Sequence, residues 1–241
     1  MAQYLRRLPS YLVKHNIAKE VTSNQASIHP KLACVAHKHK EFLKYRAPIS
    51  ASTDRILKAT QDAIQKLAKP VIMDCGCGTG ESSIQLGKTL SDHTILAIDK
   101  SAHRLNKVNK RSLLPENVFF LRANLPEVWT FAYKHKWNIK KQYLLYPNPW
   151  PKQAQLMRRW HAHPVMPYLI SLSKHIELRT NWKTYALEFA WAMEYFLGEK
   201  ATVKNWLPNT PISNFEKKYT ESGHSLYKVE IVKKTCQIKQ N

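Results

Sequence analysis

Short, fully apolar runs alternate along this chain with longer stretches in which apolar residues recur every three to four positions. The short runs predict buried strands, and the longer stretches predict amphipathic helices. The first such helix is expected after Thr53 and Asp54, which can cap it, and Pro70 ends it. Because strands and helices then alternate to the end of the chain, the pattern predicts an α/β fold with helices on both faces of a mostly parallel sheet.

Seven strands are expected in this pattern, at residues 71–73, 95–98, 118–121, 142–146, 176–180, 201–206 and 226–233. Further helices are expected at residues 81–90, 101–111, 164–174, 182–197 and 213–223. The last two strands have no full crossover helix between them, so we expect them to form an antiparallel pair at the C-terminal edge of the seven-stranded sheet.

The strand at 71–73 leads directly into Asp74-Cys75-Gly76-Cys77-Gly78-Thr79-Gly80, where three of the chain's six glycines fall within five positions. Glycine at this density after a strand predicts a turn with positive φ angles that a ligand can approach closely. Asp74 stands two places before the first glycine. Asp99 ends the next apolar run, where its carboxylate can accept both hydroxyls of a ribose.

This D-x-G-x-G-x-G pattern differs from the dinucleotide fingerprint G-x-G-x-x-G. Pyrophosphate favours a helix N-terminus free of negative charge, whereas Asp74 and Glu81 flank this turn and favour a cationic cofactor. The stretch resembles motif I of the class I S-adenosylmethionine-dependent methyltransferases, and a packing turn in another α/β protein is the alternative. The resemblance implies a Rossmann-like fold and an S-adenosyl-L-methionine site formed by Asp74, Gly76, Gly78, Gly80 and Asp99.

The chain of 241 residues has 38 Lys and Arg against 17 Asp and Glu, a formal net charge of +21. A charge of this size implies a polyanionic partner, with nucleic acid first and an anionic membrane surface second. No apolar run reaches the ~20 residues of a membrane-spanning helix, so we expect no membrane protein. The four cysteines form no C-x-x-C pair, which predicts a reducing, cytoplasmic location. A monomer or a homodimer is expected.

The N-terminal stretch is basic and lacks a sustained apolar period. Residues 1–50 hold nine Lys and Arg against two acids. We therefore predict a basic arm over residues 1–50, laid against RNA when bound, followed by a single domain over residues 51–241. A merely solvated leader is the alternative.

A one-signed basic span follows the middle of the chain. Between Glu127 and Glu177 there is no acid, while eight Lys and Arg fall there. A solvated face normally mixes charges of both signs, so this span predicts contact with a phosphate backbone. Trp137, Trp150 and Trp160 interleave with it and are candidates for stacking on bases. His161 and His163 lack companions at ligand spacing, so no metal site is expected.

Within this span lies Pro147-Asn148-Pro149-Trp150-Pro151-Lys152, called the proline loop below. Three prolines in five positions fix the backbone, so Asn148 and Trp150 are presented in one conformation. The loop follows an expected buried strand, which predicts a place at the carboxyl edge of the sheet, where parallel sheets bind ligands. A purely structural loop is the alternative.

Four segments together resemble the tRNA (guanine-N7)-methyltransferase family. The first is the stretch from Asp74 to Gly80, called the glycine turn below. The others are Tyr146-Pro-Asn-Pro-Trp-Pro-Lys152 with the trailing Arg158-Arg159, Thr180-Asn181, and Ser213-Asn-Phe-Glu216. The resemblance implies methylation of guanine 46 in the variable loop of tRNA. It implies that Asn148 is catalytic, that Asn124 and Leu125 join the cofactor site, and that the substrate is held by Lys152, Arg158, Arg159, Thr180, Asn181, Ser213, Phe215 and Glu216.

Several positions depart from the pattern of that family. Asn124, Asn148 and Asn181 stand where aspartate is common, and Gln155 or Leu156 replaces the usual loop histidine. The loss of carboxylates leaves a compensating divergent subgroup, a changed target atom and a non-catalytic RNA-binding relative open. A methyltransferase acting on amino groups is a further rival, because Asn148-Pro149-Trp150 also resembles the Asn-Pro-Pro-aromatic loop of those enzymes, without its second adjacent proline.

Overall fold

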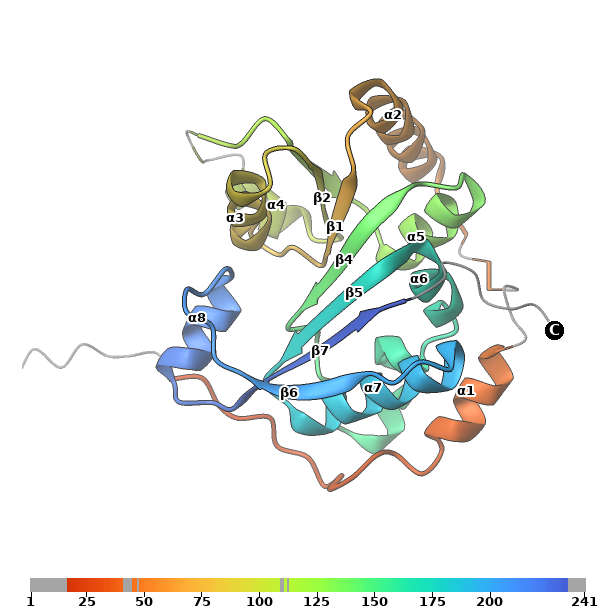
Figure 1. Ribbon diagram of the computed structural model, residues 1–241, viewed down its shortest axis with the longest axis vertical. Coiled ribbons are helices and arrows are strands. Elements are labelled where there is room, and N and C mark those ends of the chain that lie inside the picture. The colour runs from red at the N-terminus through yellow and green to blue at the C-terminus, as the bar shows by residue number, and fades with distance from the viewer. Residues whose placement is uncertain (1–16, 41–44, 47, 109–110, 112, 234–241) are drawn as a thin grey trace, which may run out of the picture.

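The structure, a computed structural model, describes residues 17–40, 45–46, 48–108, 111 and 113–233. Its centre is a seven-stranded sheet in the order β3-β2-β1-β4-β5-β7-β6 (Figure 1). The first five strands in this order, from β3 through β2, β1 and β4 to β5, are parallel. Strand β7 pairs antiparallel with both β5 and β6. The predicted mostly parallel sheet with an antiparallel C-terminal edge pair is therefore confirmed.

The strands are β1 (Val71–Cys75), β2 (Thr94–Asp99), β3 (Val118–Arg122), β4 (Ile139–Leu145), β5 (Ser173–Thr180), β6 (Thr202–Trp206) and β7 (Leu226–Val232). The α-helices are α1 (Leu32–Lys40), α2 (Ala51–Leu67), α3 (Glu81–Thr89), α4 (Ala102–Val108), α5 (Leu125–Lys134), α6 (Met166–Leu172), α7 (Lys183–Leu197) and α8 (Asn214–Glu221). Two 3₁₀-helices, η1 (Gln153–Arg158) and η2 (Trp160–Ala162), follow the proline loop.

Helices cover the two faces of the sheet unequally. Helices α2, α5, α6 and α7 pack on one face and enclose the largest apolar core, to which α1 adds Ala36. Helices α3, α4 and α8 lie on the other face and cover smaller clusters. Strands β1 and β2 are buried along their whole length, as expected of central strands with both faces covered. In Figure 1, α3 and α8 both lie to the left of β4, β5 and β7.

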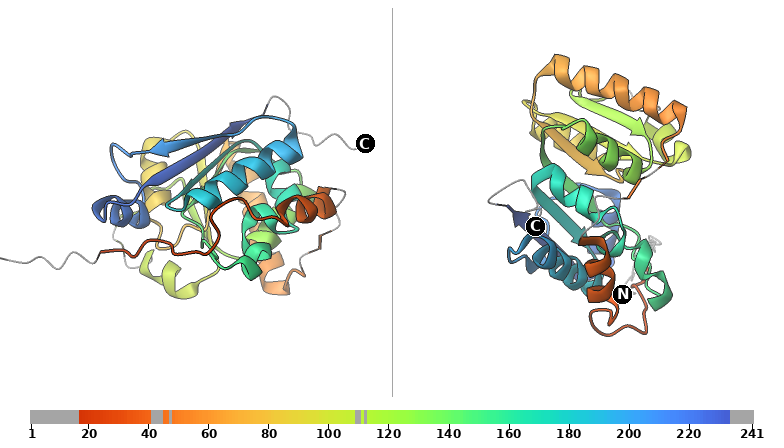
Figure 2. Two further views of the ribbon diagram at one scale, coloured as in Figure 1. Left: turned by 90° about the horizontal axis from the view of Figure 1, so that it is seen from below. Right: turned by 90° about the vertical axis from the view of Figure 1, so that its right-hand side faces the viewer.

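The chain ahead of α2 packs on the domain. Residues Ile17–Lys31, called the strap below, run along the molecule from α8 to α1 (Figures 1 and 2). Leu32 and Ala36 of α1 are buried, and α1 contacts α7. The boundary predicted at residue 50 stays a prediction, and residues 1–16 lie outside the described chain.

Two details of the helices differ from the sequence-based expectations. Ser50, and not Thr53, caps α2, because the Ser50 hydroxyl accepts a hydrogen bond from the Thr53 backbone N–H at 3.1 Å. Helix α5 was not expected, although Pro126 in its first turn is a signal for a helix start. No helix among the described residues is long and apolar enough to span a membrane.

Candidate active site

The glycine turn joins the end of β1 to the first turn of α3. Gly76, Gly78 and Gly80 have φ angles of 94°, 61° and 83°, which side chains with a Cβ rarely adopt. A Cβ added at Gly76 or Gly78 would meet no atom within 4 Å, whereas one at Gly80 would lie 2.8 Å from the Phe120 ring. The first two glycines therefore leave open space for a ligand, and the third allows α3 to pack closely.

Asp74 lies beneath the glycine turn with 1% of its surface exposed. Its Oδ2 accepts hydrogen bonds from the hydroxyls of Ser82 (2.5 Å) and Ser83 (2.6 Å), both on α3. Its Oδ1 is buried and has no hydrogen-bond partner among the described residues. Burial raises the pKa of Asp74 above its usual value, although the two hydroxyls act in the opposite direction. A cationic group beside Oδ1 would satisfy this oxygen and favour the ionised form.

Asp99, at the end of β2, is 4% exposed and already bound to the turn. Its Oδ2 accepts from the Gly78 backbone N–H at 3.0 Å and pairs with Arg104 at 3.2 Å. Its Oδ1 accepts from the Ser101 N–H at 2.8 Å. A carboxylate has about four acceptor positions, so roughly one position remains on Oδ1. This geometry allows one hydroxyl of a ribose, where the sequence suggested two.

Asn124 and Leu125 mark the end of β3 and the start of α5. Asn124 is exposed, and its Nδ2 donates to Glu127 at 3.0 Å, so its amide oxygen is free to accept from a ligand. The Leu125 side chain is 9% exposed and belongs to the core. Any cofactor contact of Leu125 would therefore involve its backbone.

The proline loop follows β4, the strand that pairs with β1 on the side away from β2. Tyr146 and Trp150 have φ angles of 50° and 48°, a conformation that costs energy in residues other than glycine. Asn148 is exposed between them, at the carboxyl edge shared with the glycine turn. The fold therefore holds Asn148 in a strained loop, which is typical of functional sites.

Two of the predicted RNA contacts lie beside this loop. Lys152 and Arg158 are exposed, and the Arg158 guanidinium lies 4.8 Å from the centre of the Trp150 ring. Of the tryptophans expected to stack on bases, Trp137 is 7% exposed and belongs to the core, and Trp160 packs edge-on against Trp129. Of the three, Trp150 is half-buried beside exposed basic residues and stays a candidate for stacking on a base.

Arg159 was predicted to contact RNA, and the structure places it inside the protein. Its side chain is fully buried, and its Nη1 forms an ion pair with Glu188 of α7 at 2.6 Å. Arg158 is the last residue of η1, whereas Arg159 lies between η1 and η2 with an extended backbone (φ −77°, ψ 137°). Arg158 therefore faces solvent while Arg159 enters the core. A buried guanidinium is not available to a phosphate.

Thr180 and Asn181 end β5 and start the connection to α7. Thr180 is 1% exposed, and its Oγ1 accepts from the Trp182 N–H at 3.2 Å. Asn181 is half-buried, and its Nδ2 lies 3.2 Å from Nδ1 of His224, which follows α8. The Thr180 side chain therefore has a local structural role, and Asn181 joins this edge of the sheet to the α8–β7 turn.

The segment Ser213 to Glu216 begins α8, and the Ser213 hydroxyl caps the helix by accepting from the Glu216 N–H at 3.1 Å. Phe215 is 49% exposed. Glu216 is fully buried, which does not agree with the direct substrate contact expected of it. Its carboxylate accepts from the hydroxyl of Tyr146 (2.9 Å), from Arg179 (2.9 Å) and from the Ile212 N–H (2.9 Å). Glu216 therefore ties α8 to the ends of β4 and β5.

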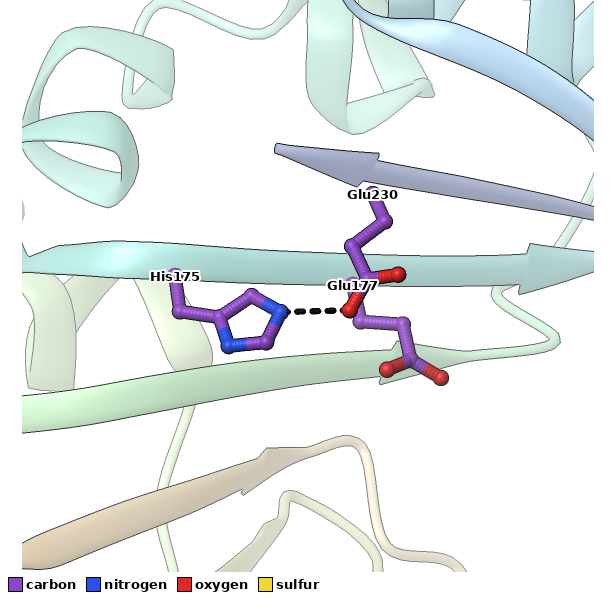
Figure 3. Close-up of side chains that lie close together, drawn as sticks. All are labelled: His175, Glu177 and Glu230. Atoms are coloured by element: carbon purple, nitrogen blue, oxygen red, sulfur yellow. Dashed lines mark hydrogen bonds and ion pairs between the residues drawn. The ribbon is translucent and has the colours of Figure 1, made fainter. Parts of the chain in front are cut away.

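A group of charged side chains lies on β5 and β7, next to the contact between β5 and α8. His175, Glu177 and Glu230 are close enough together to be considered as metal ligands (Figure 3). Lys141 forms an ion pair with Glu177 at 2.6 Å, and Arg179 does so at 2.7 Å. Because cations already occupy these carboxylates, the group fits an ion-pair network better than a metal site.

Sequence reasoning missed three residues that organise this edge. Tyr146 and Arg179 bind Glu216, and Glu188 binds Arg159. Each partner is at least 29 positions away along the chain, so no local pattern reveals the pairing. The only available signal was a charged residue within an apolar run, as for Glu188 in the middle of α7.

Comparison with known proteins agrees with this arrangement. Residues 68–229 match the model of the family described as "Putative methyltransferase". A tRNA (guanine-N(7)-)-methyltransferase from Neisseria gonorrhoeae is 25% identical over 179 residues, covering 70% of this chain and 74% of that protein. One from Leptospira interrogans is 25% identical over 195 residues, covering 76% of this chain and 88% of that protein.

Solved structures show the same fold at lower identity. A 16S rRNA (adenine(1408)-N(1))-methyltransferase mutant from Catenulisporales acidiphilia aligns with a TM-score of 0.52 at 12% identity, covering 79% of this chain and 96% of that one. A precorrin-6y C5,15-methyltransferase from Geobacter metallireducens aligns with a TM-score of 0.50 at 14% identity, covering 73% of this chain and 88% of that one. With the glycine turn, the strand order and the family match together, the chain belongs to the tRNA (guanine-N7)-methyltransferase family of class I methyltransferases, as a divergent member.

Proposed function

We propose that this protein transfers a methyl group from S-adenosyl-L-methionine to N7 of a guanine in tRNA, at guanine 46 of the variable loop. The observation that carries the proposal is the exposed Asn148, held in a strained loop on the strand next to the glycine turn. The loop brings Lys152 and Arg158 to the same edge, where a phosphate backbone can be bound. The family's curated members named above support the choice of tRNA and of N7.

The cofactor proposal rests on how the described residues fit a cationic ligand. S-adenosylmethionine would supply a methyl group on a positively charged sulfur and a second positive charge on its ammonium group. Asp74 offers a buried oxygen without a partner, and Gly76 and Gly78 leave space above it. Asp99 keeps an acceptor position for a ribose hydroxyl, and the amide oxygen of Asn124 can accept from an adenine amino group.

Guanine N7 carries a free lone pair, so the attack needs no general base and an amide at position 148 is compatible with the reaction. Positive charge moves from the sulfur to the guanine as the methyl group is transferred. The Asn148 oxygen can accept from the guanine N–H donors and orient the base. Glu216 does not supply negative charge there, because Arg179 neutralises its buried carboxylate.

The proposal is tested by incubating the protein with S-adenosylmethionine carrying a labelled methyl group and with tRNA that lacks 7-methylguanosine. We expect label in the tRNA, and none when Asp99→Ala replaces the wild type at low cofactor concentration, since Asp99 loss should weaken cofactor binding by about 2–4 kcal/mol. Tight cofactor and tRNA binding without label in the tRNA would favour the non-catalytic RNA-binding alternative.

A further inference from the structure

A closed set of polar side chains lies under the proline loop, between η1, η2, α7 and the strap. Its centre is Glu188, which is fully buried. Oε1 of Glu188 accepts from Gln25 Nε2 (2.6 Å) and from the His29 N–H (2.9 Å). Oε2 accepts from Arg159 Nη1 (2.6 Å) and lies 2.8 Å from His161 Nε2. All four acceptor positions of one carboxylate are used, and we call these five residues the Glu188 cluster.

The cluster and the strap reach three successive carbonyl groups of the proline loop. Arg159 Nε donates to the Trp150 carbonyl at 3.1 Å, and Nη2 lies 3.5 Å from the Lys152 carbonyl. The hydroxyl of Ser23, two residues before Gln25, donates to the Pro151 carbonyl at 2.7 Å. A backbone with the φ of 48° found at Trp150 persists only where its surroundings hold it, and these donors provide that hold.

The strap also contacts the residues that follow α8. The Ala18 N–H donates to the Ser222 hydroxyl at 2.9 Å, and the Ala18 carbonyl lies 3.0 Å from His224 Nε2. Ser222 and His224 follow α8, the helix that presents Phe215. The strap thus connects the end of α8 to the proline loop. Figure 1 shows that its first described residues lie beside α8.

We propose that Glu188 is a positioning residue for the candidate active site. Through Arg159 it fixes the backbone that presents Asn148 and Lys152, and through Gln25 and His29 it holds the strap across that loop. The functional part of this inference rests on the methyl transfer proposed above. Glu188 does not touch substrate, because it is fully buried, so it acts only through these neighbours.

The charge of Glu188 is what the arrangement requires. A glutamine in its place keeps the shape but offers an amide NH₂ group where Oε2 now accepts. That group would face Arg159 Nη1, which is itself only a donor, and the buried guanidinium would lose its counter-charge. Glu188→Gln should therefore release Arg159 from the loop while changing the volume of the side chain very little.

The test compares three full-length variants with the wild type. Glu188→Gln breaks the cluster. Ser23→Ala removes the strap's bond to the Pro151 carbonyl, together with the bond that the Gln25 N–H donates to the Ser23 hydroxyl at 3.1 Å. Glu194→Gln makes the same chemical change at an exposed position of α7 and serves as the control. Backbone hydrogen exchange is followed by mass spectrometry in the strap and in the proline loop, and steady-state methyl transfer to tRNA is measured in parallel.

For Glu188→Gln we expect faster exchange in the strap and in the loop, with β1 and β2 unchanged. We expect kcat to fall about 10- to 100-fold, since a small misplacement of a reacting group has effects of this size, and KM for S-adenosylmethionine to stay within about twofold. Ser23→Ala should lower kcat about 3- to 10-fold, as the loss of the hydrogen bond to the loop and of the local bond to the Gln25 N–H implies. Glu194→Gln should match the wild type in both measurements.

Unchanged exchange and unchanged kcat in Glu188→Gln would overturn the proposal. A second result would also overturn it: Glu188→Gln loses activity with faster exchange throughout the sheet, while Ser23→Ala, which leaves the buried charges in place, keeps wild-type kcat. Should the wild type transfer no methyl group, the proposed function fails, and the exchange measurement still decides whether Glu188 holds the loop. The two failures can therefore be told apart.

Discussion

In the proposed reaction, Asn148 is the residue on which the chemistry depends most. Methyl transfer to guanine N7 removes no proton, so a residue at this position orients the base and adjusts the local charge. An amide provides the orientation and lacks the negative charge of the aspartate that is usual in the family. Glu216 does not replace that charge, because Arg179 neutralises its carboxylate.

We therefore predict that Asn148→Asp raises the rate of N7 methylation and that Asn148→Ala lowers it roughly 10²-fold. The measurement is the initial rate of methyl transfer at saturating S-adenosylmethionine and tRNA. Asn138→Ala, at an exposed position before β4 on the opposite edge of the sheet, serves as the control and should have no effect. Equal rates for all three variants would show that Asn148 does not contact the base.

His163 gives the protein a pH-dependent stability. Burial lowers the pKa of His163 from 6.5 to about 4, and the nearby His39 adds to this. In the unfolded chain His163 therefore binds a proton below about pH 6.5. In the folded protein the His163 side chain stays neutral until about pH 4. Stability is fully present above pH 6.5 and is lost as the pH falls through this window, by at most about 3 kcal/mol.

The prediction is that His163→Asn reduces the difference in unfolding free energy between pH 7.5 and pH 5. Asparagine keeps an acceptor for the Val165 N–H, which now bonds His163 Nδ1 at 3.1 Å, and it does not titrate. Urea unfolding at both pH values measures the difference. The same acid destabilisation in the variant as in the wild type would assign the effect to other groups.

Among the elements, α8 and the proline loop carry several of the proposed substrate contacts, and buried ion pairs hold both. Glu216 fastens α8 to Tyr146 at the end of β4 and to Arg179 of β5. The Arg179 guanidinium also lies 4.5 Å from the centre of the Trp206 ring, which adds β6 to the contact. The position of Phe215 relative to Asn148 depends on this network.

Removing the Glu216 carboxylate should loosen α8. We predict that Glu216→Ala lowers the free energy of unfolding by about 3–5 kcal/mol, because it leaves Arg179 buried without its second partner. Methyl transfer should fall as well, roughly 10²-fold, because Phe215 loses its place. Urea unfolding measures the first effect, and Glu221→Ala, an exposed acid on the same helix, is the control. A similar small loss in both variants would contradict the role given to Glu216.

The strands and the glycine turn could be predicted from the sequence because their signals are local: apolar runs mark β1 to β5, and glycines mark a turn with positive φ. Helix α1 could not, since only Leu32 and Ala36 of its nine residues are buried. The burial of Arg159 and Glu216 also escaped prediction. Their charges suggest solvent or RNA, and only the folded chain brings Glu188 and Arg179 to them.

Across the whole molecule, a net charge of +21 acts together with the acid-free span after Glu127. The structure divides that span: Arg159 is buried, while Lys152 and Arg158 are exposed beside the proline loop. The exposed pair is therefore expected to contact phosphate groups, and the family's tRNA substrate would supply them.

We predict that tRNA binding weakens steeply with salt and that Lys152→Ala and Arg158→Ala each lower the slope of log K against log salt by roughly 0.7–0.9. Binding is measured by filter retention or anisotropy across a salt series. Lys58→Ala, at a position of α2 that is 64% exposed, is the control for a general loss of charge. Slopes that stay the same in both loop variants would place the RNA elsewhere on the molecule.

The proposed methylation of guanine N7 in tRNA by this protein can be tested by identifying the modified nucleoside. tRNA lacking 7-methylguanosine is incubated with the protein and S-adenosylmethionine, digested to nucleosides and separated by liquid chromatography with mass spectrometry. We predict 7-methylguanosine with the wild type and less of it with Asn148→Ala. A methyl group on an exocyclic amino group or another ring atom, or no methylated nucleoside from a protein that binds both ligands, would contradict it.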